Sequence, residues 1–469
     1  MVDEGQDFGS FTALCQHGAT VASDRGRPVL VSWTGTVAGC TVAEQVRRIP
    51  TEPGRRFVWA SSWTGERRLA VGTALDVTGS GADRFHQVST SWRGLRDGAL
   101  VGGTGRRPSL VGGFSFRHRD EGRGIMPDAL MWLPAAELVE MPGSPTELTL
   151  NAWITPGYDV RAAFSHAENA ACSLMNDSTV AETQQARVAS VHETPSAFEW
   201  KLLVRRVLDA IATGAFEKLV LARQLAVNFD RPVAVAPVLA ALIDQHRVGA
   251  VFGVQLGEHW LVGRTPECLL HLHDGRADTH ALAGSVPRDR HPIRDAQLAH
   301  NLQTDPKLNR EHAIVTDTVV GTMRRFFRDV RTDLADPVLK LADIQHRQTK
   351  ISAVNPRVEP DLIRLAGALH PSPAVGGLPC APAVRWLAAN EPFDRGWYAA
   401  PIGWTGVDGG GELAVGIRSA MITGASAIVY AGCGIVDGSD PDDEYHETCV
   451  KMRQMLKVLG ISDNELVAR

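Results

Sequence analysis

The sequence lacks the features that mark secreted, membrane-bound and zinc-stabilised proteins. Its seven cysteines are scattered and include no C-x-x-C pair, so neither a disulfide framework nor a structural zinc site is indicated. No stretch reaches the roughly 18 uninterrupted apolar residues of a membrane span. The N-terminus, MVDEGQDFGS, is acidic and polar where a signal peptide has a positive start and an apolar stretch. We therefore expect a cytoplasmic protein with reduced thiols.

An excess of charge of either sign is also lacking. Lysine and arginine number 48 against 53 aspartate and glutamate residues, a formal charge of -5. This balance gives no reason to expect nucleic acid or an anionic membrane as a partner, and an anionic small substrate would need a local basic site. The 469 residues can bury a large core, as two or three domains or one large α/β unit. No long apolar surface helix stands out, so we expect a monomer.

Two regions of the chain differ in their pattern. Up to about residue 150 the sequence is typical of short strands and turns, with few helix signals, and a polar, alanine-rich helix and linker follow. Beyond Thr194, helices and strands alternate: Ser196 and Glu199 form a capping box before a helix, and residues 218–229 predict a strand. We place the organisational boundary there, between residues 1–194 and 195–469.

The stretch from residue 411 to residue 438 predicts two long strands joined at Thr423-Gly424. In the first, over 412–420, alternation puts Arg418 on one face with small residues, which leaves room for a ligand carboxylate; a surface ion pair is the alternative. The second ends in Gly432-Cys433-Gly434, where the glycines either weaken the strand or let a ligand touch the backbone.

The segment GSDPDDEYHETCVKM follows, and Pro441 is expected to begin a helix in it. Glu444, Glu447 and Lys451 then share one face. By itself this spacing favours a solvated face, because Glu447 and Lys451 have the order of an exposed i,i+4 ion pair.

Three more residues have both an ordinary and a catalytic interpretation. Lys218 begins a strand and either lies in water or, if buried, becomes a neutral amine able to act as a general base. Glu267 follows Pro266 and is either a turn residue or a buried general acid. Glu311 lies at the margin of a helix that begins with Asp305 and Pro306, and a second acidic helix aimed at it would create a Mg²⁺ site.

Eight ordered blocks of the sequence resemble the chorismate-utilising enzymes. They are EKLVLAR, GRTPECLL, ALAGSVPR, DPKLNREHAIV, LHPSPAVGGLP, WYAAPIGW, GELAVGIRSA and AGCGIVDGSDPDDEYHETCVK, within residues 196–459. The resemblance implies an α/β fold of two large antiparallel sheets packed as a sandwich with helices outside. Residues 1–194 would be a sheet-rich layer and linker of that sandwich, and 195–469 the chorismate-binding region. It also implies dependence on Mg²⁺.

The resemblance also implies roles for individual residues. Lys218 matches the lysine that activates water for attack at C2 of chorismate, where anthranilate synthases generally have glutamine, and Glu267 matches the acid that protonates the departing C4 hydroxyl. The residues matching metal-binding positions are Glu311, Glu444 and Glu447. Those matching substrate-binding positions are Ser285, His346, Ala374, Tyr398, Arg418, Gly432, Gly434 and Lys451. Arg347, Gly416 and Cys433 depart from the usual leucine, alanine and alanine.

Within that family, Ala374 is the best discriminator. Isochorismate synthases have alanine at this position, whereas salicylate and anthranilate synthases typically have threonine. We therefore expect an isochorismate synthase, an isomerase that feeds a siderophore or menaquinone pathway. Salicylate synthase is the alternative. A catalytically idle chorismate-binding homologue is a third hypothesis. Such a homologue should lack at least one of Lys218, Glu267, Glu311 and Glu447, and all four are present.

Overall fold

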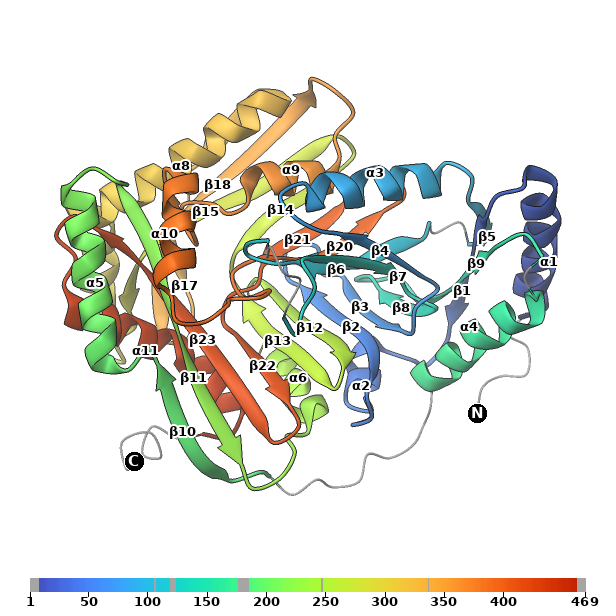
Figure 1. Cartoon of the computed structure of the whole chain (residues 1–469), viewed down its shortest axis with the longest axis horizontal. Coiled ribbons are helices and arrows are strands. Elements are labelled where there is room, and N and C mark those ends of the chain that lie inside the picture. The colour runs from blue at the N-terminus through green and yellow to red at the C-terminus, as the bar shows by residue number, and fades with distance from the viewer. Residues whose placement is uncertain are drawn as a thin grey trace.

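The computed structural model describes residues 8–104, 107–118, 124–157, 159–175, 185–245, 248–335 and 337–461. Two large sheets make up its centre, and helices lie outside them (Figure 1). Among the described strands, every pairing is antiparallel except that of β1 with β5. The mixed α/β fold of two sheets with outer helices that the sequence predicted is therefore confirmed.

The larger sheet has thirteen described strands. In spatial order they are β10 (Val188–Thr194), β11 (Lys218–Phe229), β23 (Ser426–Val436), β22 (Ser419–Thr423), β13 (His259–Thr265), β12 (Ala250–Gly257), β2 (Gly54–Ser61), β3 (Arg67–Val71), β8 (Ala136–Glu140), β9 (Thr146–Ile154), β1 (Val29–Val37) and β5 (Leu100–Gly103), with β19 (Gly377–Leu378) paired to β11.

The smaller sheet has ten described strands. Their order is β16 (Phe327–Asp333), β18 (Ile344–Pro356), β15 (Arg276–Pro287), β14 (Cys268–His273), β21 (Gly411–Val415), β20 (Pro401–Gly406), β6 (Ser109–Phe114), β7 (Ala129–Leu133) and β4 (Leu75–Gly79), with β17 (Val338–Lys340) paired to β18.

Helices cover the outer faces and ends of the sheets (Figure 1). They are α1 (Phe8–Arg25), α2 (Val42–Val46), α3 (Arg84–Arg96), α4 (Val160–Leu174), α5 (Ala197–Ala212), α6 (Val235–Asp244), α7 (Pro292–Thr304), α8 (Pro306–Phe326), α9 (Leu362–Leu369), α10 (Cys380–Asn390) and α11 (Pro441–Val458). Within the described part of the chain, no helix is long and apolar enough to cross a membrane.

Both sheets contain strands from either side of Thr194. In the larger sheet β2 pairs with β12, Val58 opposite Gly253, and in the smaller sheet β6 pairs with β20, Leu110 opposite Thr405. The apolar core lies between the sheets, where Phe57 of β2 meets Trp132 of β7 edge to face at 6.2 Å. The N-terminal and C-terminal regions therefore share one hydrophobic core.

The N-terminal region contains helices that its sequence did not reveal. Helix α3 is rich in serine, threonine and arginine and contains Gly94, so its intrinsic helix propensity is low. It forms because Phe85, Val88 and Trp92 are buried, with the ring of Phe85 stacked on Phe114 of β6 at 4.1 Å between centroids. Tertiary packing overrides the local preference here.

The strand expected over 412–420 is broken, and that expectation was wrong. Strand β21 ends at Val415 in the smaller sheet, and β22 begins at Ser419 in the larger one. The chain crosses between the sheets at Gly416, where a Cβ would lie 2.8 Å from the carbonyl oxygen of Trp397, and at Arg418, whose φ is +53°. Arg418 is therefore placed by a left-handed turn between two sheets and not by strand alternation.

One buried carboxyl makes stability depend on pH. Glu412 of β21 has no exposed surface, and burial raises its pKa to about 7. The nearby Glu66 also raises this pKa, whereas the hydrogen bond that Thr64 donates to Glu412 Oε2 at 3.1 Å lowers it. Because the folded pKa lies above the ordinary value, this contribution to stability is full at low pH and is lost as pH rises to about 7. We expect Glu412→Gln to raise the melting temperature at pH 8 and to change it little at pH 5. An equal effect at both pH values would contradict this account.

Candidate active site

Helix α11 begins where the sequence predicted it, at Pro441. The side chain of Asp440 caps it by accepting hydrogen bonds from the backbone N–H groups of Asp442 and Asp443. Helix α8 likewise begins at Pro306 after the cap Asp305. These two starts set the positions of the acidic side chains that follow on each helix.

The predicted residues gather at one cavity between the ends of the two sheets. Those that line it are Glu267, Ser285, Glu311, His346, Ala374, Tyr398, Arg418, Gly432, Gly434, Glu447 and Lys451. Lys218 and Glu444 are not among the lining residues, but Lys218 pairs with the lining residue Glu311, and Glu444 pairs with Lys307, four residues before Glu311 on α8. The segments that contain Lys218 and Lys451, more than 200 residues apart in the sequence, thus meet at this site.

Lys218 lies fully buried at the start of β11, so the solvated strand end that its sequence position allowed does not occur. Its Nζ lies 2.9 Å from Oε1 of Glu311 on α8. Burial alone would raise the pKa of Glu311, but Lys218, together with the nearby Lys451 and Lys307, holds that pKa below its usual value. Gly434 makes the pair possible, because a Cβ there would lie 2.8 Å from Cε of Lys218.

Glu267 lies at the cavity wall between β13 and β14. Its side chain is buried, and desolvation raises its pKa to about 7 even though Lys218 and Lys451 act in the opposite direction. A carboxyl group with this pKa is partly protonated at neutral pH and can donate a proton. Glu267 is therefore buried, as its interpretation as a general acid requires.

A short hydrogen-bonded chain joins Arg418, His346 and Ser285. Nη2 of Arg418 lies 2.9 Å from Nε2 of His346, and Nδ1 of His346 lies 2.9 Å from Oγ of Ser285. Burial, with Arg418 and Lys451 nearby, lowers the pKa of His346 well below its ordinary value, so the ring is neutral. A guanidinium can only donate, so Nε2 accepts and Nδ1 donates to Ser285. Ser285 accepts this hydrogen bond, so its hydroxyl proton is left to donate elsewhere.

Tyr398 and Arg418 lie on the same wall of the cavity. Tyr398 is buried, stacks on Tyr430 with ring centroids 4.9 Å apart, and faces Gly432, where a Cβ would lie 3.2 Å from the phenol oxygen. Burial lowers the pKa of Arg418 to about 10, which still leaves its guanidinium charged at neutral pH. The pair offers a phenol O–H and a guanidinium to one carboxylate.

The i,i+4 pair of α11 is present but lies inside the cavity wall. Nζ of Lys451 is 2.5 Å from Oε1 of Glu447 and donates to the carbonyl oxygen of Gly432 at 2.9 Å. The side chains of Lys451 and Glu447 are only 15% and 26% exposed. The solvated face that the spacing alone favoured is therefore wrong.

The acidic side chains of α8 and α11 face one region that also contains Lys307. Nζ of Lys307 lies 2.9 Å from Oε1 of Glu444, and Glu444, Glu311 and Glu447 all act to raise the pKa of Lys307. Burial and the nearby Glu447 raise the pKa of Glu444. Three carboxylates thus share a small region in which lysines balance their charge.

Two residues at the site were missed from the sequence. Lys307 is four residues before Glu311 on α8, so helical spacing offered a signal for it. Arg395 lines the cavity, pairs with Glu391, and donates to the carbonyl oxygen of Val220 at 2.7 Å. Nothing in the sequence around Arg395 indicated this position.

Comparison with known proteins agrees with this geometry. Residues 15–460 match the family described as chorismate binding enzyme. The chain is 32% identical over 424 residues to the isochorismate synthase MenF of Bacillus subtilis strain 168, covering 87% of this chain and 88% of that protein. It is 33% identical over 404 residues to the salicylate biosynthesis isochorismate synthase of Pseudomonas aeruginosa, covering 84% and 83%.

Among solved structures, the menaquinone-specific isochorismate synthase MenF of Escherichia coli shares the fold. Its TM-score is 0.77 at 24% sequence identity, and the match covers 96% of this chain and 100% of that chain. The family match extends over nearly the whole chain and includes both sheets. The chain belongs to the chorismate-binding enzyme family.

Proposed function

We propose that this protein is an isochorismate synthase, which converts chorismate to isochorismate. The observation that carries the proposal is the pairing of a buried lysine, Lys218, with a buried acid of raised pKa, Glu267, at one cavity. Relatives at 32% and 33% identity that bear the name isochorismate synthase support it. Ala374, which lines the cavity, retains the small side chain expected of that activity.

The reaction needs both a base and an acid. Water is a poor nucleophile, so Lys218 in its neutral form would take a proton from water as its oxygen bonds to C2 of the ring. Hydroxide is a poor leaving group, so Glu267 would protonate the C4 oxygen as that C–O bond breaks. One water enters and one leaves, and the double bonds shift between them. Proton exchange with solvent then restores Lys218 and Glu267.

The cationic and hydroxyl groups would hold the substrate carboxylates. Tyr398 and Arg418 are suited to the enolpyruvyl carboxylate, since a guanidinium binds a carboxylate through two hydrogen bonds. Ser285 and Lys451 would contact the ring side of the substrate. Gly432 and Gly434 would let the ring approach the backbone of β23.

The acidic residues fit Mg²⁺ by their chemistry. Carboxylate oxygens are the donors that Mg²⁺ prefers, and Glu311, Glu444 and Glu447 face one region near Lys307. As placed, each of them is held by a lysine, and the described part of the chain has no group of three acidic, histidine or cysteine side chains set close enough to hold a metal. Those carboxylates would turn from their lysines to hold the ion. Bound Mg²⁺ would neutralise a substrate carboxylate beside them.

Removing the metal or one of its ligands should weaken the enzyme measurably. We expect chelation of the metal to abolish turnover and added Mg²⁺ to restore it. Glu447→Gln should weaken Mg²⁺ binding, measured by calorimetry, by at least the roughly 10- to 100-fold that loss of outer-sphere partners costs. Asp442→Asn is the matched control, because it removes one charge from the same helix at a side chain that is 73% exposed. Equal effects of both variants would argue against Glu447 as a ligand.

One assay tests the proposed function. Purified protein with chorismate and Mg²⁺ should yield a near-equilibrium mixture of chorismate and isochorismate. Dominant salicylate and pyruvate would show a salicylate synthase, ammonium-dependent anthranilate would overturn the role of Lys218, and no turnover would favour an idle homologue. A cytoplasmic location, a monomeric state and the absence of nucleic-acid and membrane partners stay predictions.

A further inference from the structure

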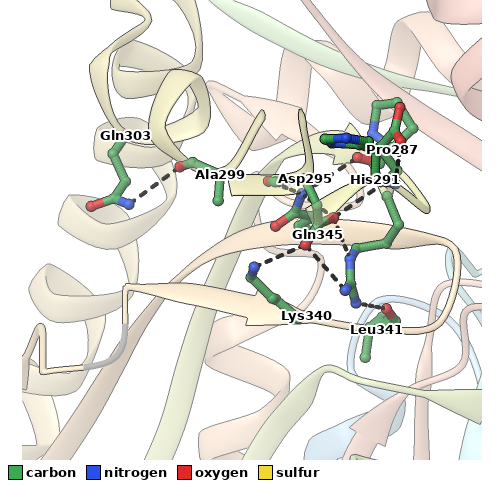
Figure 2. A network of polar contacts seen from close by, with 10 residues as sticks. Pro287, His291, Asp295, Ala299, Gln303, Lys340, Leu341 and Gln345 are labelled. Carbon is green, nitrogen blue, oxygen red and sulfur yellow. Dashed lines mark hydrogen bonds and ion pairs between the residues drawn. The ribbon is translucent and has the colours of Figure 1, made fainter. Parts of the chain in front are cut away.

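Asp295 lies at the centre of a polar cluster outside the cavity. It is on α7 and only 6% exposed. Its carboxylate accepts hydrogen bonds from Arg288 at 2.7 and 3.1 Å, from Lys340 at 3.0 Å, from the backbone of Asp289 at 3.2 Å and from Gln345 at 3.2 Å. Figure 2 shows Gln345 and Lys340 reaching Asp295 from the strands beneath the helix. The cluster thus holds a helix to several strands through one carboxylate.

These strands are the ones that flank His346. On β15, Ser285 pairs with His346 and Val286 with Gln345; on β17, Lys340 pairs with Gln345. His346 is therefore the next residue along β18 from a partner of Asp295. Arg288 leaves β15 three residues after Ser285 and also donates to the carbonyl oxygen of Leu341 in the turn between β17 and β18 at 2.7 Å.

The pairing of Ser285 with His346 sits in a short stretch of ladder. The register of β15 with β18 shifts between Leu282 and Ser285, where Gly284 has φ +81°. Beyond this irregularity only Ser285, Val286 and Pro287 of β15 pair with β18 before the strand ends. A ladder this short has few backbone hydrogen bonds to hold its register. The Asp295 cluster lies at its far end.

The charges of the cluster depend on Asp295. Arg288 and Lys340 both approach its carboxylate, which has its pKa held well below the usual value by these two cations. Without that carboxylate the two cations would face each other and repel. The Nε2 amide of Gln345 would keep only backbone acceptors, which include the carbonyl oxygen of Asp295 at 3.2 Å. The strand ends would then separate or rotate.

We propose that Asp295 is a positioning residue, which holds the ends of β15, β17 and β18 so that Ser285 and His346 meet the substrate in register with Arg418. This inference rests on the proposed function, because it assigns these residues to substrate binding. Asp295 itself does not line the cavity.

The test is Asp295→Asn, which preserves size and removes the charge. Because Ser285, His346 and Arg418 would bind substrate and transition state alike, we expect the KM for chorismate to rise about 10- to 100-fold, the scale of a misplacement near 1 Å, while kcat stays within about threefold. A residue that only stabilises the fold would lower the melting temperature without this division between KM and kcat.

Two further variants sharpen the result. Lys340→Met removes a partner of Asp295 whose side chain is 43% exposed, and we expect KM to change by less than about twofold, since exposed ion pairs contribute little. Gln345→Leu removes the link to β18 and should raise KM as Asp295→Asn does. The double variant, Asp295→Asn with Gln345→Leu, should have a KM no higher than that of either single variant, because both substitutions act through the same contact.

The affinity for an equilibrium mixture of chorismate and isochorismate, measured by calorimetry, separates this inference from the proposed function. If the unmodified protein binds the mixture but does not interconvert its components, the proposed function fails while Asp295→Asn still tests positioning. Unchanged affinity and KM in Asp295→Asn would overturn the inference. If that variant does not fold, unchanged values in Gln345→Leu would overturn it, and a rise in KM with constant kcat would support it.

Discussion

Replacing Lys218 by alanine should abolish the addition of water to chorismate, with kcat reduced by about 10²- to 10⁴-fold, the usual contribution of a general base. The lysine is fully buried and contacts Glu311, so bulk water has no access to take over the role of its side chain. Isochorismate formation from chorismate, followed over time with Mg²⁺ present, is the measurement. Normal turnover would remove Lys218 from the role of base.

Folding must be controlled in this experiment, because the variant leaves a buried carboxylate without its partner. Lys218→Gln is the matched control: its amide can still donate a hydrogen bond to Glu311 and fills much of the same volume, but it is not a base. We expect the glutamine variant to melt close to the unmodified protein and yet to show the same loss of kcat. Activity in the glutamine variant alone would show that Lys218 acts through packing and hydrogen bonding.

Glu267→Gln should have an effect of similar size, about 10²- to 10⁴-fold on kcat, because an amide cannot protonate the departing hydroxyl. The substitution is nearly isosteric and removes a group whose pKa is raised by burial, so the fold should be retained or stabilised at alkaline pH. Circular dichroism and thermal unfolding would verify this. A glutamine variant with normal kcat would assign proton donation to another group.

The pH dependence of the unmodified protein follows from the same group. The pKa of Glu267 is raised to about 7, and the acid must be protonated to act, so kcat/KM should fall as pH rises through about 7. Glu267→Gln, with its small residual activity, should lose this alkaline limb. The same limb persisting in the variant would show that a different residue titrates there.

Local sequence patterns predicted part of the cavity correctly. Helix starts at Pro306 and Pro441 followed from local capping chemistry, and the strand at Lys218 followed from its apolar run. Arg418 was expected at the site for the wrong reason, because strand alternation was extended through a crossover that moves the chain from one sheet to the other. Local periodicity contains no information about such a change of sheet.

Two environments could not be inferred from sequence at all. The pair Glu447 and Lys451 has the same spacing whether the helix face is wet or buried, and only the packing of α11 on β23 decides that it is buried. Asp295 is an ordinary acidic residue in the first turn of a helix, a position that usually serves the helix dipole. Its contacts come from β17, from β18 and from the segment that follows β15, which only the folded chain brings beneath it.

The sequence by itself determined the identity and order of the chemical groups, the helix starts and the family, because these depend on residue type and on neighbours within a few positions. The tertiary structure alone decided which of these groups are desolvated. Burial of Lys218 and Glu267, the raised pKa of Glu267 and the hydrogen-bond direction from Arg418 through His346 to Ser285 all arise where distant segments exclude water together. Electrostatic effects of this kind depend on the surrounding dielectric, which no short stretch of sequence specifies.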